Sequence, residues 1–241
     1  MTAATEDTRT APAGTSGKPL ADVLGGPAAD DGHLRTPWTV LEDYQCFGCS
    51  PHNAHGLRLR FRERPDGIST TFQLGPTHES YPGVVHGGLL GVICDETMGN
   101  LIVLRVGQPA FTTAMRVRFL APVLVGAVHE CRARIIPGAG GSTLINTEAD
   151  VVDAAGTVVA TARATYRPVA LEAARDRIQI SDDAAGRLAR VLAATADAAG
   201  RPLADQPPAG RPLADQPPTD RPVADEPRGG QLPYVPASEE S

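Results

Sequence analysis

The chain has 241 residues, of which 41% are hydrophobic and only 4% aromatic, and it contains 25 glycines and 22 prolines. This length fits one domain with extensions or two small domains, and the abundance of glycine and proline favours a smaller globular part flanked by flexible stretches. The formal net charge is −6, and lysine occurs only at Lys18. A nucleic-acid partner is therefore not expected, because phosphate binding needs a surplus of basic side chains on one face.

Membrane-spanning and secreted proteins are two further classes that the sequence does not favour. It has no run of about 18 apolar residues, the length that a transmembrane helix needs, so no membrane partner is predicted. Residues 1–14 lack the cationic and apolar regions of a secretory signal, which favours a cytoplasmic location. The four cysteines, Cys46, Cys49, Cys94 and Cys131, are too few and too unevenly spaced for a secreted disulfide scaffold.

Both ends of the chain have the composition of disordered segments. Residues 1–35 mix alanine, glycine, threonine, proline and aspartate without sustained periodicity. From residue 200 the sequence contains three copies of a decapeptide similar to GRPLADQPPA. The prolines exclude a continuous helix or a central strand, and so few apolar side chains cannot form a core. We expect a disordered extension over 1–35 and a disordered, proline-rich repeat tail over 200–241.

Between these ends, the hydrophobic periodicity changes in an orderly way along the chain. Alternating apolar and basic residues predict a strand over 57–63, which a turn connects to a second strand over 68–74. Residues 86–107 are apolar on nearly every side and contain no proline, so they predict one buried helix. Four more strands are predicted over 110–120, 128–136, 142–152 and 157–167, followed by an alanine-rich helix over 175–199.

This order of elements is an α+β pattern. The short connections between the strands favour antiparallel pairing. A helix that is apolar on nearly every side is covered only when a sheet curls around it. We therefore expect a curved antiparallel sheet wrapped around one long central helix.

Asp95 is unexpected inside such a helix, because burying a carboxylate without compensation costs several kcal/mol. Three glycines share its helical face, namely Gly88, Gly91 and Gly99. Glycine destabilises a helix interior by about 1 kcal/mol relative to alanine, so this stripe needs a reason. Either it lets a neighbouring element pack closely, or it lets a substrate or a partner subunit reach the carboxylate; the residues alone leave both open.

The start of the helix, His86-Gly87-Gly88, is suited to stabilising an anion. The first turn of a helix has unpaired N–H groups at the positive end of its dipole, and two glycines let a ligand oxygen approach them closely. Such a helix start and a carboxylate further along the same helix together predict an acyl-transfer site.

The stretch YPGVVHGGLLGVICDETMG resembles the hotdog-fold thioesterases of the PaaI-like family, in which an acid follows the histidine of HGG by nine residues. Similarity extends upstream through CFGCSPHNAHGLRLRF and downstream through FTTAMRVRFLAPV, and covers about residues 40–168. The resemblance implies a hotdog thioesterase domain over 36–170 and assembly into a homodimer or homotetramer. The alanine-rich pattern that follows predicts a C-terminal helical extension over 171–199.

By this resemblance the chain is an enzyme that hydrolyses an acyl-CoA or acyl-carrier-protein thioester, without a cofactor or a metal. The backbone N–H of Gly88, or that of Gly87, would polarise the thioester carbonyl. Asp95 of the partner subunit would activate water or attack the carbonyl directly. His86 would orient the loop or contact the thioester.

A threonine or serine early in the following strand would position the water. Thr112 and Thr113 are both candidates, and counting back from Pro122 favours Thr112. Many relatives carry Asn or Gln a few residues before HGG, whereas this chain has Glu79 and Ser80. Ser80 is therefore a candidate for binding the substrate.

Three charged residues complete the predicted substrate-binding set. Glu96 follows the proposed catalytic acid, and Arg116 and Arg118 alternate with apolar residues along a predicted strand. The two arginines either contact the phosphates of coenzyme A at the subunit boundary or form a solvated outer face.

The spacing C-x2-C-x2-H-x2-H, formed by Cys46, Cys49, His52 and His55, is compatible with a zinc site. Structural zinc sites, however, usually draw their ligands from two separated elements. Ordinary loop packing is therefore favoured, and no metal is predicted.

Two other functions are weaker alternatives. A hotdog-fold enoyl-thioester hydratase or dehydratase ranks lower because the sequence lacks the Asp-x-Asn-x-x-His spacing and the His-Phe-Pro loop of those relatives. A non-catalytic acyl-CoA-binding protein, or a scaffold that recruits partners through its repeats, belongs to a different class. The sequence does not reveal the acyl group.

Overall fold

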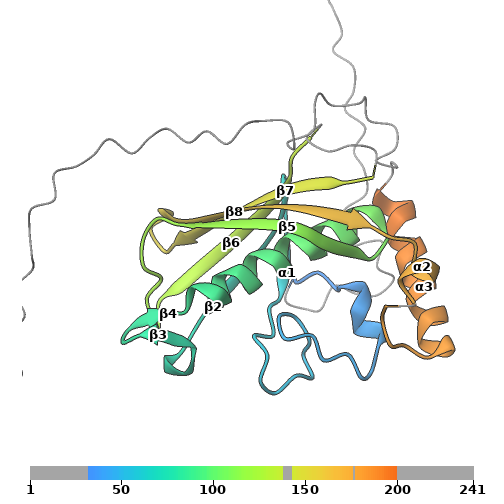
Figure 1. Cartoon of the computed structure of the whole chain (residues 1–241), viewed down its shortest axis with the longest axis horizontal. Coiled ribbons are helices and arrows are strands. Elements are labelled where there is room, and N and C mark those ends of the chain that lie inside the picture. Colours follow the sequence, from blue (N-terminus) through green and yellow to red (C-terminus); the bar gives the residue numbers. More distant parts are fainter. Residues whose placement is uncertain (1–31, 138–142, 176, 200–241) are drawn as a thin grey trace, which may run out of the picture. The chain divides into compact units, whose positions relative to one another are not determined.

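The computed structural model describes residues 32–137, 143–175 and 177–199 (Figure 1). The tail predicted over 200–241 lies outside these residues, as does nearly all of the extension predicted over 1–35. Within the last part of that extension, Leu34 N–H donates to the Phe61 carbonyl oxygen at 2.7 Å. Residues just before 36 therefore already pair with the sheet.

A six-stranded antiparallel sheet forms the main layer, with its strands in the order β1-β2-β6-β7-β8-β5. Its strands are β1 Phe61–Arg64, β2 Gly67–Gln73, β5 Ala110–Phe119, β6 Val128–Ile135, β7 Ile145–Asp153 and β8 Val158–Pro168. A separate two-stranded sheet joins β3 Glu79–Tyr81 to β4 Val84–Val85. Strand β5 therefore lies at one edge of the main sheet.

The long helix α1 spans Gly87–Val106 and lies against one face of the main sheet (Figure 1). The other helices are α2 Leu171–Ala174 and α3 Asp182–Ala199, with two short 3-10 turns, η2 Pro37–Val40 and η3 Pro76–His78. This arrangement confirms the predicted α+β hotdog architecture. In the part of the chain that the structure describes, no helix is both long and apolar enough to cross a membrane.

Neighbouring elements cover helix α1 on two sides, so its apolar surface is removed from water. On the sheet side, β8 presents Ala160, Ala162 and Ala164, all buried, and their small side chains let the helix lie close to the strands. On the other side, Leu57 and Leu59 from the segment before β1 join the same apolar core. The helix is thus the centre of the core.

The predicted strand over 57–63 begins later than expected, at Phe61. Leu57 N–H and Leu59 N–H donate to the carbonyl oxygens of Phe47 and Gly48, and not to a neighbouring strand. Arg58 between them has a left-handed backbone, with φ 51°. Apolar and basic residues do alternate here, but residues 57–59 hydrogen-bond to the loop that contains Phe47 and Gly48 and do not belong to a strand. The short strands β3 and β4 had no corresponding prediction.

Helix α3 packs against the end of α1 through a second apolar cluster that includes Val103, Leu188 and Leu192. Helix α1 ends at Gly107, whose φ of 67° is left-handed. A Cβ atom there would overlap the Leu192 carbonyl oxygen and the Ala196 Cβ atom. The absence of a side chain at Gly107 therefore permits the close contact between the two helices.

We expect Gly107→Ala to lower the free energy of unfolding more than Gly126→Ala does. Both glycines have a left-handed backbone, which costs a non-glycine residue about 1 kcal/mol, but a Cβ at Gly126 would meet nothing within 4 Å. Overlap with α3 adds roughly 1–3 kcal/mol at Gly107 alone. Chemical denaturation of the two variants measures the difference, and equal losses would contradict this account of the α1–α3 contact.

Candidate active site

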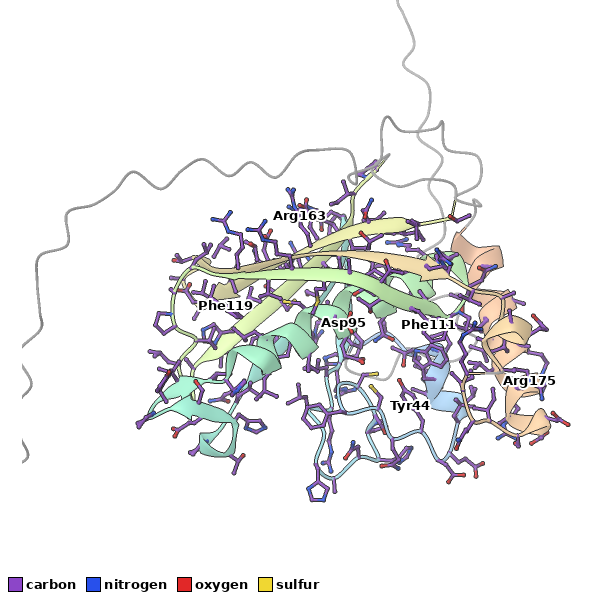
Figure 2. All side chains as sticks on the ribbon, viewed as in Figure 1. Tyr44, Asp95, Phe111, Phe119, Arg163 and Arg175 are labelled. Carbon is purple, nitrogen blue, oxygen red and sulfur yellow. The ribbon has the colours of Figure 1, made fainter. Side chains whose placement is uncertain are left out.

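Asp95 lies in the middle of α1 (Figure 2) and is partly exposed, and two hydroxyl groups are directed at it. Its Oδ1 accepts a hydrogen bond from Thr112 Oγ1 at 2.8 Å and another from the Tyr166 hydroxyl at 2.7 Å. The Tyr166 hydroxyl also lies 3.1 Å from the Asp95 backbone carbonyl oxygen. Among the described residues, no hydrogen bond reaches Asp95 Oδ2. One carboxylate oxygen is therefore held, and the other is available.

Strand register explains why these two hydroxyls converge. Thr112 of β5 stands directly opposite Tyr166 of β8, so both side chains face α1. The register shifts between Thr112 and Ala114. Within this irregularity, Thr113 Oγ1 donates to the Thr165 carbonyl oxygen at 2.9 Å. Of the two predicted threonines, the structure brings Thr112 to the carboxylate and turns Thr113 to the neighbouring strand.

Tyr166 is the residue of this group that the sequence analysis missed. It is 1% exposed and continues the buried side of β8 after three alanines, so a lone tyrosine on an otherwise small, apolar face was the available signal. Burial raises its pKa far above the usual value, and the Asp95 charge raises it further. The phenol therefore stays protonated and remains a hydrogen-bond donor.

The start of α1 differs in one respect from the expectation. His86 caps the helix, and its Nδ1 accepts from Gly88 N–H at 2.9 Å. Gly88 N–H, the first choice for polarising a carbonyl, is thus already engaged. Gly87 N–H has no hydrogen-bond acceptor within the described ranges, so Gly87 supplies the free donor.

A mostly apolar groove of about 380 Å³ lies beside this helix start. It is lined by β3, β4, the first turn of α1 and the end of β5, including Ser80, Tyr81, Val84, Gly87, Leu90 and Phe119. Asp95 does not line the groove. With a rise of about 1.5 Å per residue, Gly87 and Asp95 are roughly 12 Å apart along the helix axis.

The glycine stripe around Asp95 faces β5 and β8. A Cβ at Gly91 would lie 3.7 Å from Met115 Cε, and one at Gly99 would lie 3.6 Å from Tyr166 Cε1. Both distances are ordinary van der Waals contacts, so a methyl group would fit at either position and the packing does not by itself require glycine there. The space at Gly87 is smaller, because a Cβ added there would lie 3.1 Å from the Phe119 ring. Gly87 also borders the groove.

Glu96 does not face the groove. Its Oε1 accepts from Cys46 Sγ at 3.0 Å and its Oε2 accepts from Asn100 Nδ2 at 3.2 Å. Burial is the main cause that raises the pKa of Glu96 to about 8, and the Cys46 contact adds to it. The structure thus gives this predicted substrate-binding residue partners in the loop before β1 and in α1 itself.

The four residues of the predicted C-x2-C-x2-H-x2-H set do not come together. Cys46 and Cys49 lie near Glu96, with one donor atom of each residue within 4.8 Å of the others. His52 and His55 are exposed and do not belong to this group.

Arg116 and Arg118 alternate with Met115, whose side chain faces α1, so the arginines project from the opposite face of β5. Arg116 stands opposite Arg163, which lies on the outer side of the sheet and is 3.3 Å from Glu148 (Figure 2). This placement favours a solvated outer face over contact with a substrate in the groove. Ser80, in contrast, lines the groove.

Residues 82–160 match the family model of the thioesterase superfamily. No curated protein matches the chain. A hypothetical thioesterase of Streptococcus pneumoniae TIGR4, solved with coenzyme A, is 22% identical with a TM-score of 0.42, over 46% of this chain and 86% of that one. The E. coli PaaI protein from the phenylacetic acid degradation operon is 18% identical with a TM-score of 0.43, over 47% of this chain and 80% of that one. A Streptococcus mutans UA159 protein bound to acetyl CoA is 20% identical with a TM-score of 0.44, over 54% of this chain and 96% of that one.

Proposed function

We propose that the chain is a thioesterase that hydrolyses an acyl thioester of coenzyme A or of an acyl carrier protein, and the match of residues 82–160 to the thioesterase superfamily supports this proposal. The observation that carries this proposal is the Asp95 carboxylate, with one oxygen held by Thr112 and Tyr166 and the other available. Such a group acts as a general base toward water or as a nucleophile toward the thioester carbonyl. The apolar groove beside Gly87 is the proposed place for the acyl-pantetheine arm.

In the general-base route, Asp95 accepts a proton from a water molecule as the water oxygen attacks the carbonyl carbon. The carbonyl oxygen becomes an oxyanion, which the free Gly87 N–H and the positive end of the α1 dipole stabilise. The carbon–sulfur bond then breaks, the thiolate takes up a proton, and the free acid is released. In the nucleophilic route, Asp95 attacks first and water hydrolyses the resulting anhydride.

Both routes require two copies of the chain. A reacting carbonyl must lie about 3 Å from both the attacking group and the N–H donor. Gly87 and Asp95 of one copy are too far apart for this, with about 12 Å between them along α1. A two-fold partner would bring its Asp95 to the Gly87 of the first copy, and would form a second, identical site at the same time.

Strand β5 is the proposed contact between the copies. It lies at the sheet edge and leaves Phe111, Met115 and Phe119 exposed, Phe119 by 57%. An edge strand that exposes backbone donors together with large apolar side chains favours association with a second chain. Thr112, which holds Asp95, belongs to the same strand.

We expect Asp95→Asn to lower the rate of thiol release from acyl-CoA by 100-fold or more, in line with the roughly 10²–10⁴-fold contribution of a general base. The amide keeps the shape of the side chain but cannot accept a proton or attack. The measurement is release of free thiol across short-chain, long-chain and aryl acyl-CoAs. Wild-type rates in the variant would show that Asp95 is not catalytic, and wild-type protein that is stabilised by acyl-CoA without releasing thiol would favour the non-catalytic binder.

We expect Thr112→Val and Tyr166→Phe each to lower kcat by roughly 10–100-fold, because a hydrogen bond to a charged group contributes about 1.5–3 kcal/mol. Thr113→Val is the matched control, since that hydroxyl bonds to the Thr165 carbonyl and not to Asp95. The assay is again thiol release, under saturating acyl-CoA. An equal loss in the Thr113 variant would show that the effect comes from the strand and not from the carboxylate.

We expect Met115→Asp to give a monomer without thioesterase activity, because a charge on the β5 edge disfavours association. Val128→Asp is the control, since Val128 is 47% exposed but lies on β6. Light scattering coupled to size-exclusion chromatography measures the oligomeric state. A monomeric wild type with full activity would overturn the two-copy site.

A further inference from the structure

Three groups that are typical metal ligands lie together on the side of α1 that faces away from the sheet. They are the thiols of Cys46 and Cys49 and the carboxylate of Glu96, with one donor atom of each residue within 4.8 Å of the others. The two cysteines come from the loop before β1, and Glu96 comes from the middle of α1. The cluster therefore joins two elements that are far apart in the sequence.

The surroundings of the cluster form a fitted shell. Gly48 lies between the two cysteines, and a Cβ atom there would overlap the Glu96 side chain, so the loop backbone packs directly on the carboxylate. Gly48 N–H donates to Cys46 Sγ at 3.3 Å. Asn100 Nδ2 lies 3.9 Å from Cys49 Sγ, and the Tyr44 hydroxyl lies 3.5 Å from the same sulfur. Neighbours of this kind orient the ligands in metal sites.

The protein alone satisfies this polar cluster poorly. A thiol is a weak hydrogen-bond donor, yet the Glu96 carboxyl is surrounded by the thiols of Cys46 and Cys49, with the Asn100 amide as its stronger donor. Asn100 is 5% exposed, and its Oδ1 is buried without a hydrogen-bond partner. Buried polar groups normally have partners, because an unpaired one costs free energy. A divalent cation would give the two thiols and the carboxyl group a stronger partner than they give one another.

We propose that Cys46, Cys49 and Glu96 bind one zinc ion, which fastens the loop before β1 to helix α1. Two thiolates with a carboxylate are ligands that zinc accepts in tetrahedral sites, and thiolates disfavour magnesium and calcium. Zinc takes all three ligands in their deprotonated forms, so binding releases the protons that the two thiols and the Glu96 carboxyl carry, and a water molecule or a neighbouring side-chain oxygen completes the fourth position.

The structure also removes the objection that the sequence raised against zinc. The objection was that all four candidate ligands lay in one short segment, whereas zinc ligands usually come from separated elements. The C-x2-C pair remains, but Glu96 from α1 takes the place of His52 and His55. The site is structural in role, because its ligands lie apart from the Thr112 and Tyr166 hydroxyls that hold Asp95.

The first experiment measures zinc by elemental analysis in the full-length protein purified without added metal. We expect about one zinc per chain, with the content lost in Cys46→Ser, Cys49→Ser and Glu96→Gln. The double variant His52→Ala, His55→Ala is the matched control and should keep its zinc. Zinc that persists in the cysteine variants, or that disappears only in the histidine variant, would overturn this ligand set.

A second measurement covers the case in which a ligand variant fails to fold. Wild-type protein, stripped by a chelator under reducing conditions, should show a lower melting temperature that zinc restores and magnesium does not. Cobalt(II) in place of zinc should give the charge-transfer absorption of thiolate ligands. A chelated protein with an unchanged melting temperature and no cobalt–thiolate absorption would overturn the proposal, as would a Cys46–Cys49 disulfide in the protein as isolated. Neither result depends on thioesterase activity.

Discussion

Helix α1 is apolar on nearly every side, and the rest of the structure depends on covering it. The sheet covers one side and the segment before β1 covers another. The helix lies close to the strands because β8 presents small, buried alanines to it. Polar groups on this helix must therefore find partners in the neighbouring elements, since they have limited access to water.

The two adjacent acids of α1 meet this constraint in different ways. Successive residues of a helix point about 100° apart, so Asp95 faces the strands and Glu96 faces the loop. Asp95 receives hydroxyl donors from two paired strands, which suit a charged carboxylate. Glu96 receives a thiol and an amide under a tightly packed backbone, an environment that favours either its neutral form or a bound cation.

The edge of the sheet connects this helix to the proposed catalysis. The cover over α1 ends at β5, where Thr112 reaches Asp95 while Met115 and Phe119 remain exposed. Burying that edge against a second copy would protect the apolar side chains and exclude water from around the carboxylate. The same contact would supply the Gly87 N–H that one copy cannot bring to its own Asp95. In this proposal, assembly and chemistry share one surface.

The sequence by itself determined the order and kind of the main elements, because the periodicity of apolar residues is a local property that follows the burial of each strand and helix. It also made Asp95, an acid inside a buried helix after HGG, the candidate catalytic residue, and favoured Thr112 over its neighbour. Only the tertiary structure decided which residues distant in the chain meet them. Tyr166 lies 71 positions after Asp95, and Cys46 lies 50 positions before Glu96. Such contacts depend on strand register and on where a loop lies against a helix, and no short stretch of sequence encodes either one.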